Sequence, residues 1–200
     1  MKKIIVITSV AIALGAMLFV GCAKPPTEKV AALKDQIAKL EGQGASVFAS
    51  QQYDQVVAGM ADLQGLMDNK KNKAATAKAD SLDILVKDLE PVIQTNAPAA
   101  AKQGVDAAKA ELANFKKMMA TPEAKKVIGK DGIKKMQDMT VGFDKDVANL
   151  DSEMGNSAFL NAYNDSNTLK GKITAAGQEC TQKMEEAKAK KGAKAPAKKK

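Results

Sequence analysis

Apolar residues recur every three or four positions along most of the chain, with lysines and acidic residues between them. This spacing places the apolar side chains on one face of an α-helix. No segment alternates apolar and polar residues for long enough to indicate a β-strand. The sequence therefore predicts an all-α protein built from elongated helical hairpins or a helical bundle. The predicted apolar stretches are residues 30–40, 53–67, 75–92, 105–119, 133–154 and 159–184.

Glycines and polar clusters mark the expected helix ends. The expected ends and turns are Gly42 with Gly44, residues 68–71 and residues 155–157. Thr121-Pro122-Glu123 is a strong helix start, because it supplies a capping hydroxyl, a proline in the first turn and an acid near the positive end of the helix dipole. Ser50 is expected to cap an earlier helix.

Two places are expected to interrupt or bend the helices. Pro91 and Pro98 each remove a backbone donor and crowd the preceding turn, and Asn96 between them can cap a new helix. Residues 129–132, which hold two glycines, are expected to break the helix that begins at Thr121.

The two halves of the chain share a pattern at a constant offset of 87 residues. The matching positions are Ala61, Leu63, Met67, Asn69, Ala75 and Leu82 with Ala148, Leu150, Met154, Asn156, Ala162 and Leu169. Each match keeps the apolar register and the turn, which favours two related helical hairpins in tandem, although alanine-rich helices also match by chance.

Residues 45–89 contain Phe48-Ala49-Ser50 and Tyr53 before one helix, and an alanine-rich second helix. This segment resembles a family of bacterial lipoproteins with a helical-hairpin domain of unassigned function. The resemblance covers about a quarter of the chain. It implies helices and a location in the cell envelope, and it carries over no catalytic residue.

The N-terminus has the build of a secretion signal: Lys2 and Lys3, an apolar run over 4–20, and the small residue Gly21 before Cys22. Residues 18–22 resemble the bacterial lipobox, with Phe19 where that motif prefers leucine. The resemblance implies cleavage before Cys22 and attachment of diacylglyceryl and N-acyl chains to this cysteine. The alternative is an uncleaved transmembrane helix, because the run approaches the length that spans a bilayer.

Ala23 follows the lipobox cysteine, where the inner-membrane sorting rule of enteric bacteria places aspartate. The resemblance to that rule favours the periplasmic face of the outer membrane. We therefore expect a signal peptide over 1–21, a tether over 22–27, a helical domain with the first hairpin over 28–120 and a second hairpin over 121–186. A disordered basic tail is expected over 187–200.

All 31 basic residues are lysines, and the chain has no arginine, histidine or tryptophan. The commonest general base, metal ligand and bidentate phosphate ligand are therefore missing. Neighbouring acids such as Asp144 with Asp146, or Glu185 with Glu186, point to different faces of a helix and are expected to be solvated. We expect no catalytic residue, cofactor or metal, and no enzymatic activity. The ten methionines leave open a Cu(I) thioether site, with core filling favoured.

Cys180 has no intrachain partner once Cys22 carries lipid. Because Cys180 falls on the apolar face of its predicted helix, burial is favoured over a disulfide between two copies of the chain.

The positive charge gathers at the C-terminus. Residues 22–186 hold 22 lysines and 23 acids, whereas the tail holds seven lysines and no acid. The tail lysines are Lys188, Lys190, Lys191, Lys194, Lys198, Lys199 and Lys200. Their expected partners are anionic envelope surfaces: lipopolysaccharide, phospholipid headgroups or the peptide carboxylates of peptidoglycan. The tail is similar to those of linker histones, but an exported chain would rarely meet DNA, so no nucleic-acid partner is expected.

The architecture is also similar to that of the major outer-membrane lipoprotein of enteric bacteria, which joins an N-terminal lipid, a helical rod and a C-terminal lysine linked to peptidoglycan. This similarity implies that Lys200 could be covalently attached to the cell wall. The leading hypothesis is a scaffold between a membrane and an anionic surface, another copy of the chain or another helical envelope protein. The alternative is a chaperone-like or assembly module whose groove binds an amphipathic segment.

Overall fold

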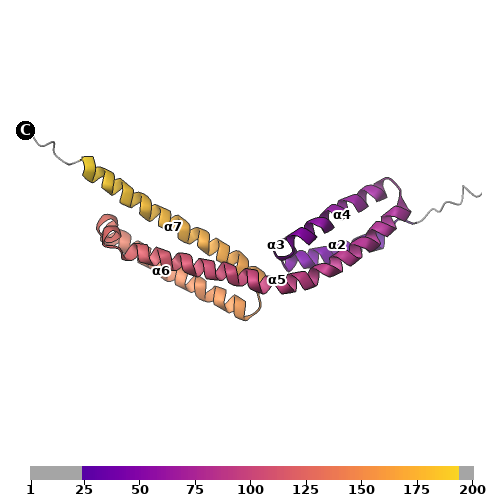
Figure 1. The fold of residues 1–200 in the computed structure, drawn as a ribbon, viewed down its shortest axis with the longest axis horizontal. Coiled ribbons are helices and arrows are strands. Elements are labelled where there is room, and N and C mark those ends of the chain that lie inside the picture. Colours follow the sequence, from indigo (N-terminus) through magenta and orange to yellow (C-terminus); the bar gives the residue numbers. More distant parts are fainter. Residues whose placement is uncertain (1–23, 194–200) are drawn as a thin grey trace, which may run out of the picture. The chain divides into compact units, whose positions relative to one another are not determined.

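The computed structural model describes residues 24–193, and this part of the chain forms six helices and no β-strand (Figure 1). The prediction of an all-α fold is therefore confirmed. None of these helices is both long enough and apolar enough to cross a membrane. The helices are α2 (Thr27–Gly42), α3 (Ala45–Phe48), α4 (Ser50–Asp68), α5 (Asn72–Ala120), α6 (Pro122–Gly155) and α7 (Phe159–Ala193).

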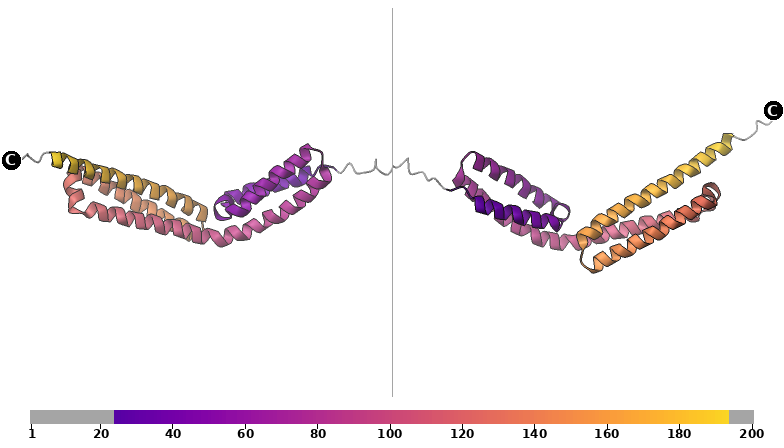
Figure 2. Two further views of the ribbon diagram at one scale, coloured as in Figure 1. Left: turned by 45° about the horizontal axis from the view of Figure 1, so that its top comes forward. Right: turned by 180° about the vertical axis from the view of Figure 1, so that it is seen from behind.

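The chain divides into two compact units within α5, between Ile93 and Gln94. Unit 1 contains α2, α3, α4 and the first part of α5, and unit 2 contains the rest of α5 with α6 and α7 (Figure 2). The sequence pattern predicted a border at 120–121, where α5 ends. The observed border lies earlier because residues 94–120 pack with α6 and α7.

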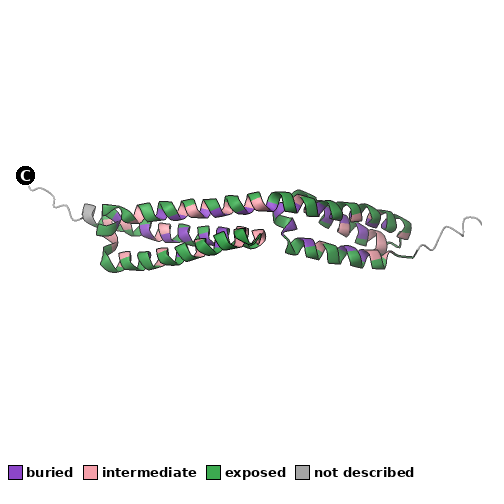
Figure 3. Cartoon of the chain, turned by 90° about the horizontal axis from the view of Figure 1, so that it is seen from below, coloured by how far each residue is buried: buried purple, intermediate pink, exposed green. Residues whose placement is uncertain are grey.

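A narrow apolar core runs along each unit. Figure 3 shows the buried positions as bands on the helix faces that turn toward one another within a unit. The core of unit 1 includes Val30, Leu33, Leu40, Phe48, Val56, Leu63, Leu82 and Leu89. The core of unit 2 includes Ala101, Val105, Leu112, Phe115, Met136, Phe143, Leu150, Leu169 and Ile173. Leucine, valine and alanine dominate both cores, so the helices can approach one another closely.

Helix α5 is continuous over 49 residues and passes through both prolines. The expected interruption at Pro91 and Pro98 is therefore wrong. Pro91 is exposed, so its ring lies on the solvent side, while Ile93 and Ala97 remain buried on the opposite face. Burial of this face offsets the cost of about 3 kcal/mol that a proline imposes inside a helix.

The spacing of buried residues in α5 changes where the two units divide. Buried positions follow alternate steps of four and three up to Ile93, then steps of four through Ala97 and Ala101 to Val105. The alternation resumes from Val105 to Phe115. A single heptad register therefore does not run through α5, and each unit has its own buried face on this helix.

The helical hairpins α4–α5 and α6–α7 contain the same type of turn. In the first, the amide of Lys70 donates to the carbonyl of Met67, and the amide of Lys71 donates to that of Leu66. At the offset of 87, the amides of Ser157 and Ala158 donate to the carbonyls of Met154 and Glu153. Lys70 (φ 55°) and Ser157 (φ 58°) both adopt left-handed backbone conformations. Each turn thus closes its helix with the hydrogen bonds of a Schellman motif.

Buried positions in the two hairpins also correspond. Leu63, Ala79, Leu82 and Val86 are buried in unit 1, and Leu150, Ser166, Leu169 and Ile173 are buried at the equivalent positions of unit 2. Together with the turns, this agreement supports the prediction of two related hairpins.

Two local expectations about helix ends need correction. The side chain of Ser50 caps no helix: Ala49 precedes α4 in the capping position without a side-chain hydrogen bond. The tail was expected to be disordered from residue 187, whereas α7 continues to Ala193. Alanine and lysine are good helix formers, so the end of α7 extends beyond its last packed residues.

Gly104 of α5 lies directly against Ser166 of α7. A Cβ atom added at Gly104 would lie 2.4 Å from the Ser166 Oγ, which is fully buried and donates a hydrogen bond to the Tyr163 carbonyl at 2.7 Å. The same added Cβ would lie 3.5 Å from the Ser166 Cβ, an ordinary van der Waals distance. The hydroxyl alone therefore forbids a side chain at position 104.

We expect Gly104→Ala to lower the free energy of unfolding by about 1 kcal/mol, because the displaced Ser166 hydroxyl loses its partner inside the core. In a Ser166→Ala background the same change should stabilise by up to about 1 kcal/mol, through the higher helix propensity of alanine. Urea unfolding of the wild type, the two single variants and the double variant measures how far the two substitutions depend on one another. An equal effect of Gly104→Ala with serine or alanine at position 166 would show that the Ser166 hydroxyl does not restrict position 104.

Candidate functional site

The residues predicted from sequence to act in function lie partly outside the described part of the chain. Cys22 lies before it, and Lys194, Lys198, Lys199 and Lys200 lie beyond it. Lys188 and Lys190 are exposed on α7, and Lys191 lies in the last turn of this helix. The structure therefore positions the first lysines of the tail on unit 2.

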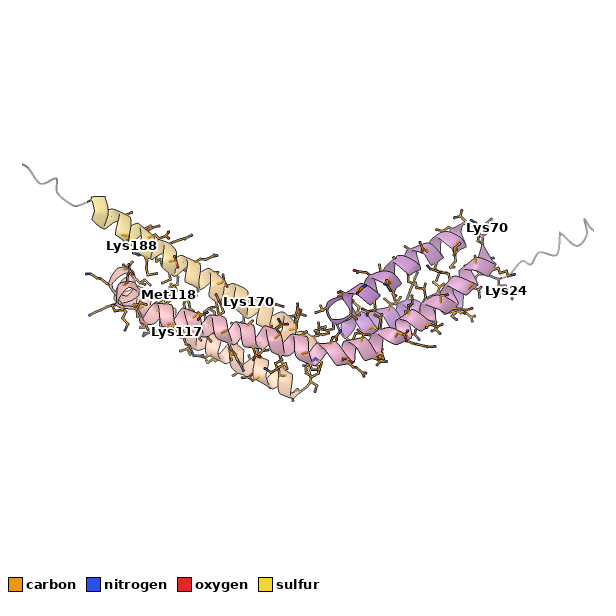
Figure 4. The ribbon with its side chains drawn as sticks, viewed as in Figure 1. Lys24, Lys70, Lys117, Met118, Lys170 and Lys188 are labelled. Carbon is orange, nitrogen blue, oxygen red and sulfur yellow. The ribbon has the colours of Figure 1, made fainter. Side chains whose placement is uncertain are left out.

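Three helix ends meet at one end of unit 2: the end of α5, the start of α6 and the end of α7. The Thr181 hydroxyl of α7 lies 3.9 Å from the Met118 sulfur of α5, and the Lys188 Nζ of α7 lies 3.0 Å from a carboxylate oxygen of Glu123 in α6. Figure 4 shows Lys117, Met118 and Lys188 at this end and Lys170 farther along α7.

Local sequence sets the path of the chain from α5 into α6. The Thr121 hydroxyl accepts a hydrogen bond from the Ala124 amide at 3.2 Å, and Pro122 occupies the first turn, as predicted. Gly129 has φ 71° and ψ 173°, so the predicted break in α6 is confirmed at this residue. At Gly132 an added Cβ would lie 2.3 Å from a methyl group of Ile128, so a larger residue would disturb the kinked turn.

We call residues 116–135 and 183–190 the lysine-rich end of unit 2, because these ranges hold ten lysines and four acids. Four of the lysines form ion pairs: Lys116 with Asp144, Lys135 and Lys183 with Glu179, and Lys188 with Glu123. The other six are exposed and form no ion pair within residues 24–193. These are Lys117, Lys125, Lys126, Lys130, Lys134 and Lys190.

A sulfur-rich part of the core lies beneath the lysine-rich end. The thiol of Cys180 is fully buried and lies 3.7 Å from the Met119 sulfur, so the favoured prediction of burial is confirmed. Met136 is buried as well, and Met118 and Met139 pack against the same cluster. These methionines fill core space between the helices. Among the described residues, no three His, Cys, Asp or Glu side chains gather in a way that could hold a metal ion.

A groove with an apolar floor runs between α5 and α6 at the lysine-rich end. This α5/α6 groove has a volume of about 410 Å³, and Met119, Ile133 and Val141 contribute to its apolar lining. Lys116 and Lys125 also line it. Val141 is 56% exposed, so this side of the groove leaves apolar surface in contact with water.

A second groove lies between α5 and α7. This α5/α7 groove has a volume of about 760 Å³, with Phe115, Met118 and Ile173 on its apolar side. Its rim is polar but nearly uncharged: Asn114, Gln178 and Gln182 accompany a single acid, Glu111.

The neighbouring acids Asp144 and Asp146 have different ion-pair partners. Asp144 pairs with Lys116 of α5 at 2.6 Å, whereas Asp146 pairs with Lys172 of α7 at 3.6 Å. Both carboxylates are about half exposed. Each therefore links α6 to a different neighbouring helix.

Glu153 and Asp165 form an acidic pair near the other end of unit 2. Burial, and secondarily the nearby Asp165 carboxylate, raise the pKa of Glu153. One carboxylate oxygen of Glu153 is buried without a hydrogen-bond partner among the described residues. Glu153 is therefore held in a setting that disfavours its charged form.

Comparison with known proteins does not assign this arrangement to a family. No family model matches the chain, and the comparisons with curated proteins and with solved structures likewise find no match.

The basic excess was predicted in the tail, and the lysines of α5 and α6 were not part of that prediction. Residues 116–135 alone hold seven lysines and two acids, a run that is visible in the sequence. The structure places this run next to Lys188 of α7, a contact between distant segments that local sequence does not predict.

We expect Glu153→Gln to stabilise the protein more at pH 7 than at pH 4. The folded-state pKa of Glu153 is raised, so the folded state binds this proton more tightly than the unfolded state does. The free energy of unfolding therefore falls as pH rises from the pKa of Glu153 in the unfolded state through its pKa in the folded state. Glutamine carries no ionisable proton, so the variant does not lose this stability. Urea unfolding at both pH values measures the difference, with exposed Glu185→Gln as control. If Glu153→Gln raised the free energy of unfolding no more at pH 7 than at pH 4, the pKa of Glu153 would not be raised in the folded protein.

We also expect Cys180 to react slowly with iodoacetamide in the folded protein and rapidly in urea. Burial raises the pKa of this thiol despite the opposing charge of Lys183, and so lowers the fraction of reactive thiolate. Mass spectrometry of timed samples measures the rate. Rapid labelling of the folded protein, or a disulfide-linked dimer on non-reducing gels, would show that Cys180 is accessible.

Proposed function

We propose that this protein is a non-enzymatic lipoprotein of the cell envelope, anchored through acyl chains on Cys22. In this proposal the two helical units are a scaffold, and lysines near the C-terminus hold an anionic envelope surface. The resemblance of residues 18–22 to the lipobox supports the anchor. Acyl chains contribute about 0.8 kcal/mol per buried methylene, so two or three of them give stable attachment.

The local excess of lysines over acids supports the proposal. Over residues 22–186 lysines and acids are nearly balanced, and some of them pair between helices, as in Lys78 with Asp62 and Lys109 with Asp151. The lysine-rich end of unit 2 instead holds ten lysines and four acids, and it continues into the tail. The positive charge thus gathers far along the chain from the cysteine that would carry the lipid.

The end of unit 1 where α2 begins also fits a position close to a membrane. Lys24, two residues after Cys22, lies at the same end of unit 1 as Lys70 in the α4–α5 turn (Figure 4). With Lys71 and Lys73, these lysines are exposed and form no ion pair in the part of the chain that the structure describes. Lysines beside a lipid anchor add electrostatic attraction to anionic headgroups.

Ala23 supports a location on the periplasmic face of the outer membrane, by resemblance to the sorting rule. There the lysines would face lipopolysaccharide, phospholipid headgroups or peptidoglycan. A covalent link from Lys200 to peptidoglycan belongs to the same proposal, as the strongest form of attachment.

The α5/α7 groove favours a second candidate function, an assembly or chaperone-like module. Its apolar side could receive the apolar face of an amphipathic helix, and its nearly uncharged rim would place little restriction on the charge of the partner. This activity would need neither the anchor nor the tail lysines.

The mature protein is expected to begin at Cys22 and to carry acyl chains there. Mass spectrometry of the protein purified from membranes measures both features. We expect Cys22→Ala to prevent lipid attachment and to leave the full-length precursor unprocessed. An intact Met1 or an unmodified Cys22 in the wild-type protein would exclude the lipoprotein.

Replacing Lys194, Lys198, Lys199 and Lys200 by glutamine should release part of the protein from cell-wall fractions, because it removes four of the tail charges while keeping chain length. Immunoblots of boiled and unboiled sacculi measure the retained protein, and Lys34→Gln with Lys39→Gln serves as a control in unit 1. Unchanged retention would instead favour the groove-binding function.

A further inference from the structure

At the lysine-rich end, exposed lysines and exposed apolar surface lie close together, and the proposed scaffold does not explain the apolar surface. Five of its unpaired lysines belong to the end of α5 and the start of α6, not to the tail. The α5/α6 groove opens among them, with Lys116 and Lys125 in its lining and the half-exposed Val141 on its apolar side.

We propose that the lysine-rich end is a docking surface for an anionic phospholipid bilayer. Lipid phosphates meet the unpaired lysines, and one acyl chain enters the α5/α6 groove. This inference rests on the proposed function and specifies which anionic surface the scaffold holds.

Charge complementarity selects an anionic partner. The ranges 116–135 and 183–190 carry six more lysines than acids, and the unpaired lysines are exposed on the three helices that meet at this end. Lysines near an anionic lipid surface act additively and lose their effect with rising salt. Such an array binds many headgroups weakly, as a membrane surface requires.

The groove distinguishes a lipid from a purely polar polyanion. Peptidoglycan could pair with the lysines but offers no long acyl chain for the surface formed by Met119, Ile133 and Val141. A phospholipid supplies a phosphate and an acyl chain in one molecule. Lysine stems can also lie along apolar surface while their ammonium groups reach the headgroups.

The positions of the lysines also favour a bilayer over an acidic helix. A helix lying in the groove would reach Lys116 and Lys125, which line it. Lys117, Lys126, Lys130 and Lys134 are not among the lining residues. An extended anionic surface can meet these lysines together with the groove.

The proposal is tested by vesicle capture with the full-length processed protein. The protein is inserted into neutral phosphatidylcholine vesicles and mixed with labelled acceptor vesicles, of phosphatidylcholine alone or with phosphatidylglycerol. We expect capture of the phosphatidylglycerol vesicles only, and loss of capture at high salt. Equal capture of both acceptors, or preferential retention on purified sacculi, would overturn the proposal.

Two variants with matched controls test the residues. Replacing Lys125, Lys126, Lys130 and Lys134 by glutamine should reduce capture about tenfold or more, whereas replacing Lys34, Lys39, Lys145 and Lys170 should have little effect at equal net charge. Val141→Asn should weaken capture several-fold, and Val57→Asn, at a 48% exposed position of α4, should not. Equal effects within either pair would contradict the proposed surface.

Flotation of the protein with the neutral vesicles separates this inference from the anchor. If the protein floats but captures no anionic acceptors, the anchor stands and the docking surface is wrong. If it does not float, the anchor fails, and the same protein is added directly to phosphatidylglycerol vesicles. Binding that depends on Lys125, Lys126, Lys130 and Lys134 then supports the surface, and its absence refutes it.

Discussion

Each helical unit depends on burying a narrow apolar face built from small and medium side chains. Alanines such as Ala101 and Ala108 allow close helix packing. At Gly104 the helices are so close that an added Cβ would overlap the Ser166 hydroxyl. Because the cores are so thin, few side chains can be buried, and most charged residues must lie on the outside. Ion pairs link some of these charges between helices, as in Lys109 with Asp151, and the local excess of lysines over acids lies at the lysine-rich end of unit 2.

In helix α5, burial of the apolar face outweighs the tendency of proline to end a helix. Its two prolines would end an isolated helix, yet the helix continues because its buried face contributes to the core of unit 1 before Ile93 and to that of unit 2 after Gln94. Between Ile93 and Val105 the buried positions of α5 follow steps of four residues, unlike the alternating steps on either side. The same helix ends among the lysines that we assign to docking.

Features controlled by neighbouring residues were predictable from sequence. The cap at Thr121, the break at Gly129 and the turns before Asn72 and Phe159 follow from side-chain and backbone chemistry within a few positions. Burial of Cys180 followed from helical periodicity. The continuity of α5 and the grouping of α6 lysines with Lys188 depend on packing between distant segments, so a reading of local patterns missed both. The anchor at Cys22 stays a prediction.

We propose that the chain carries a lipid anchor near the start of its sequence and binds an anionic surface with the lysine-rich end. An environment-sensitive dye on Lys130→Cys tests it directly, because Cys180 is buried and Cys22 would carry lipid. With the protein anchored in neutral vesicles, addition of phosphatidylglycerol vesicles should shift the dye emission to the blue, as the probe enters the headgroup region. Emission that stays unchanged on addition of anionic vesicles, or shifts equally with neutral ones, would contradict the account.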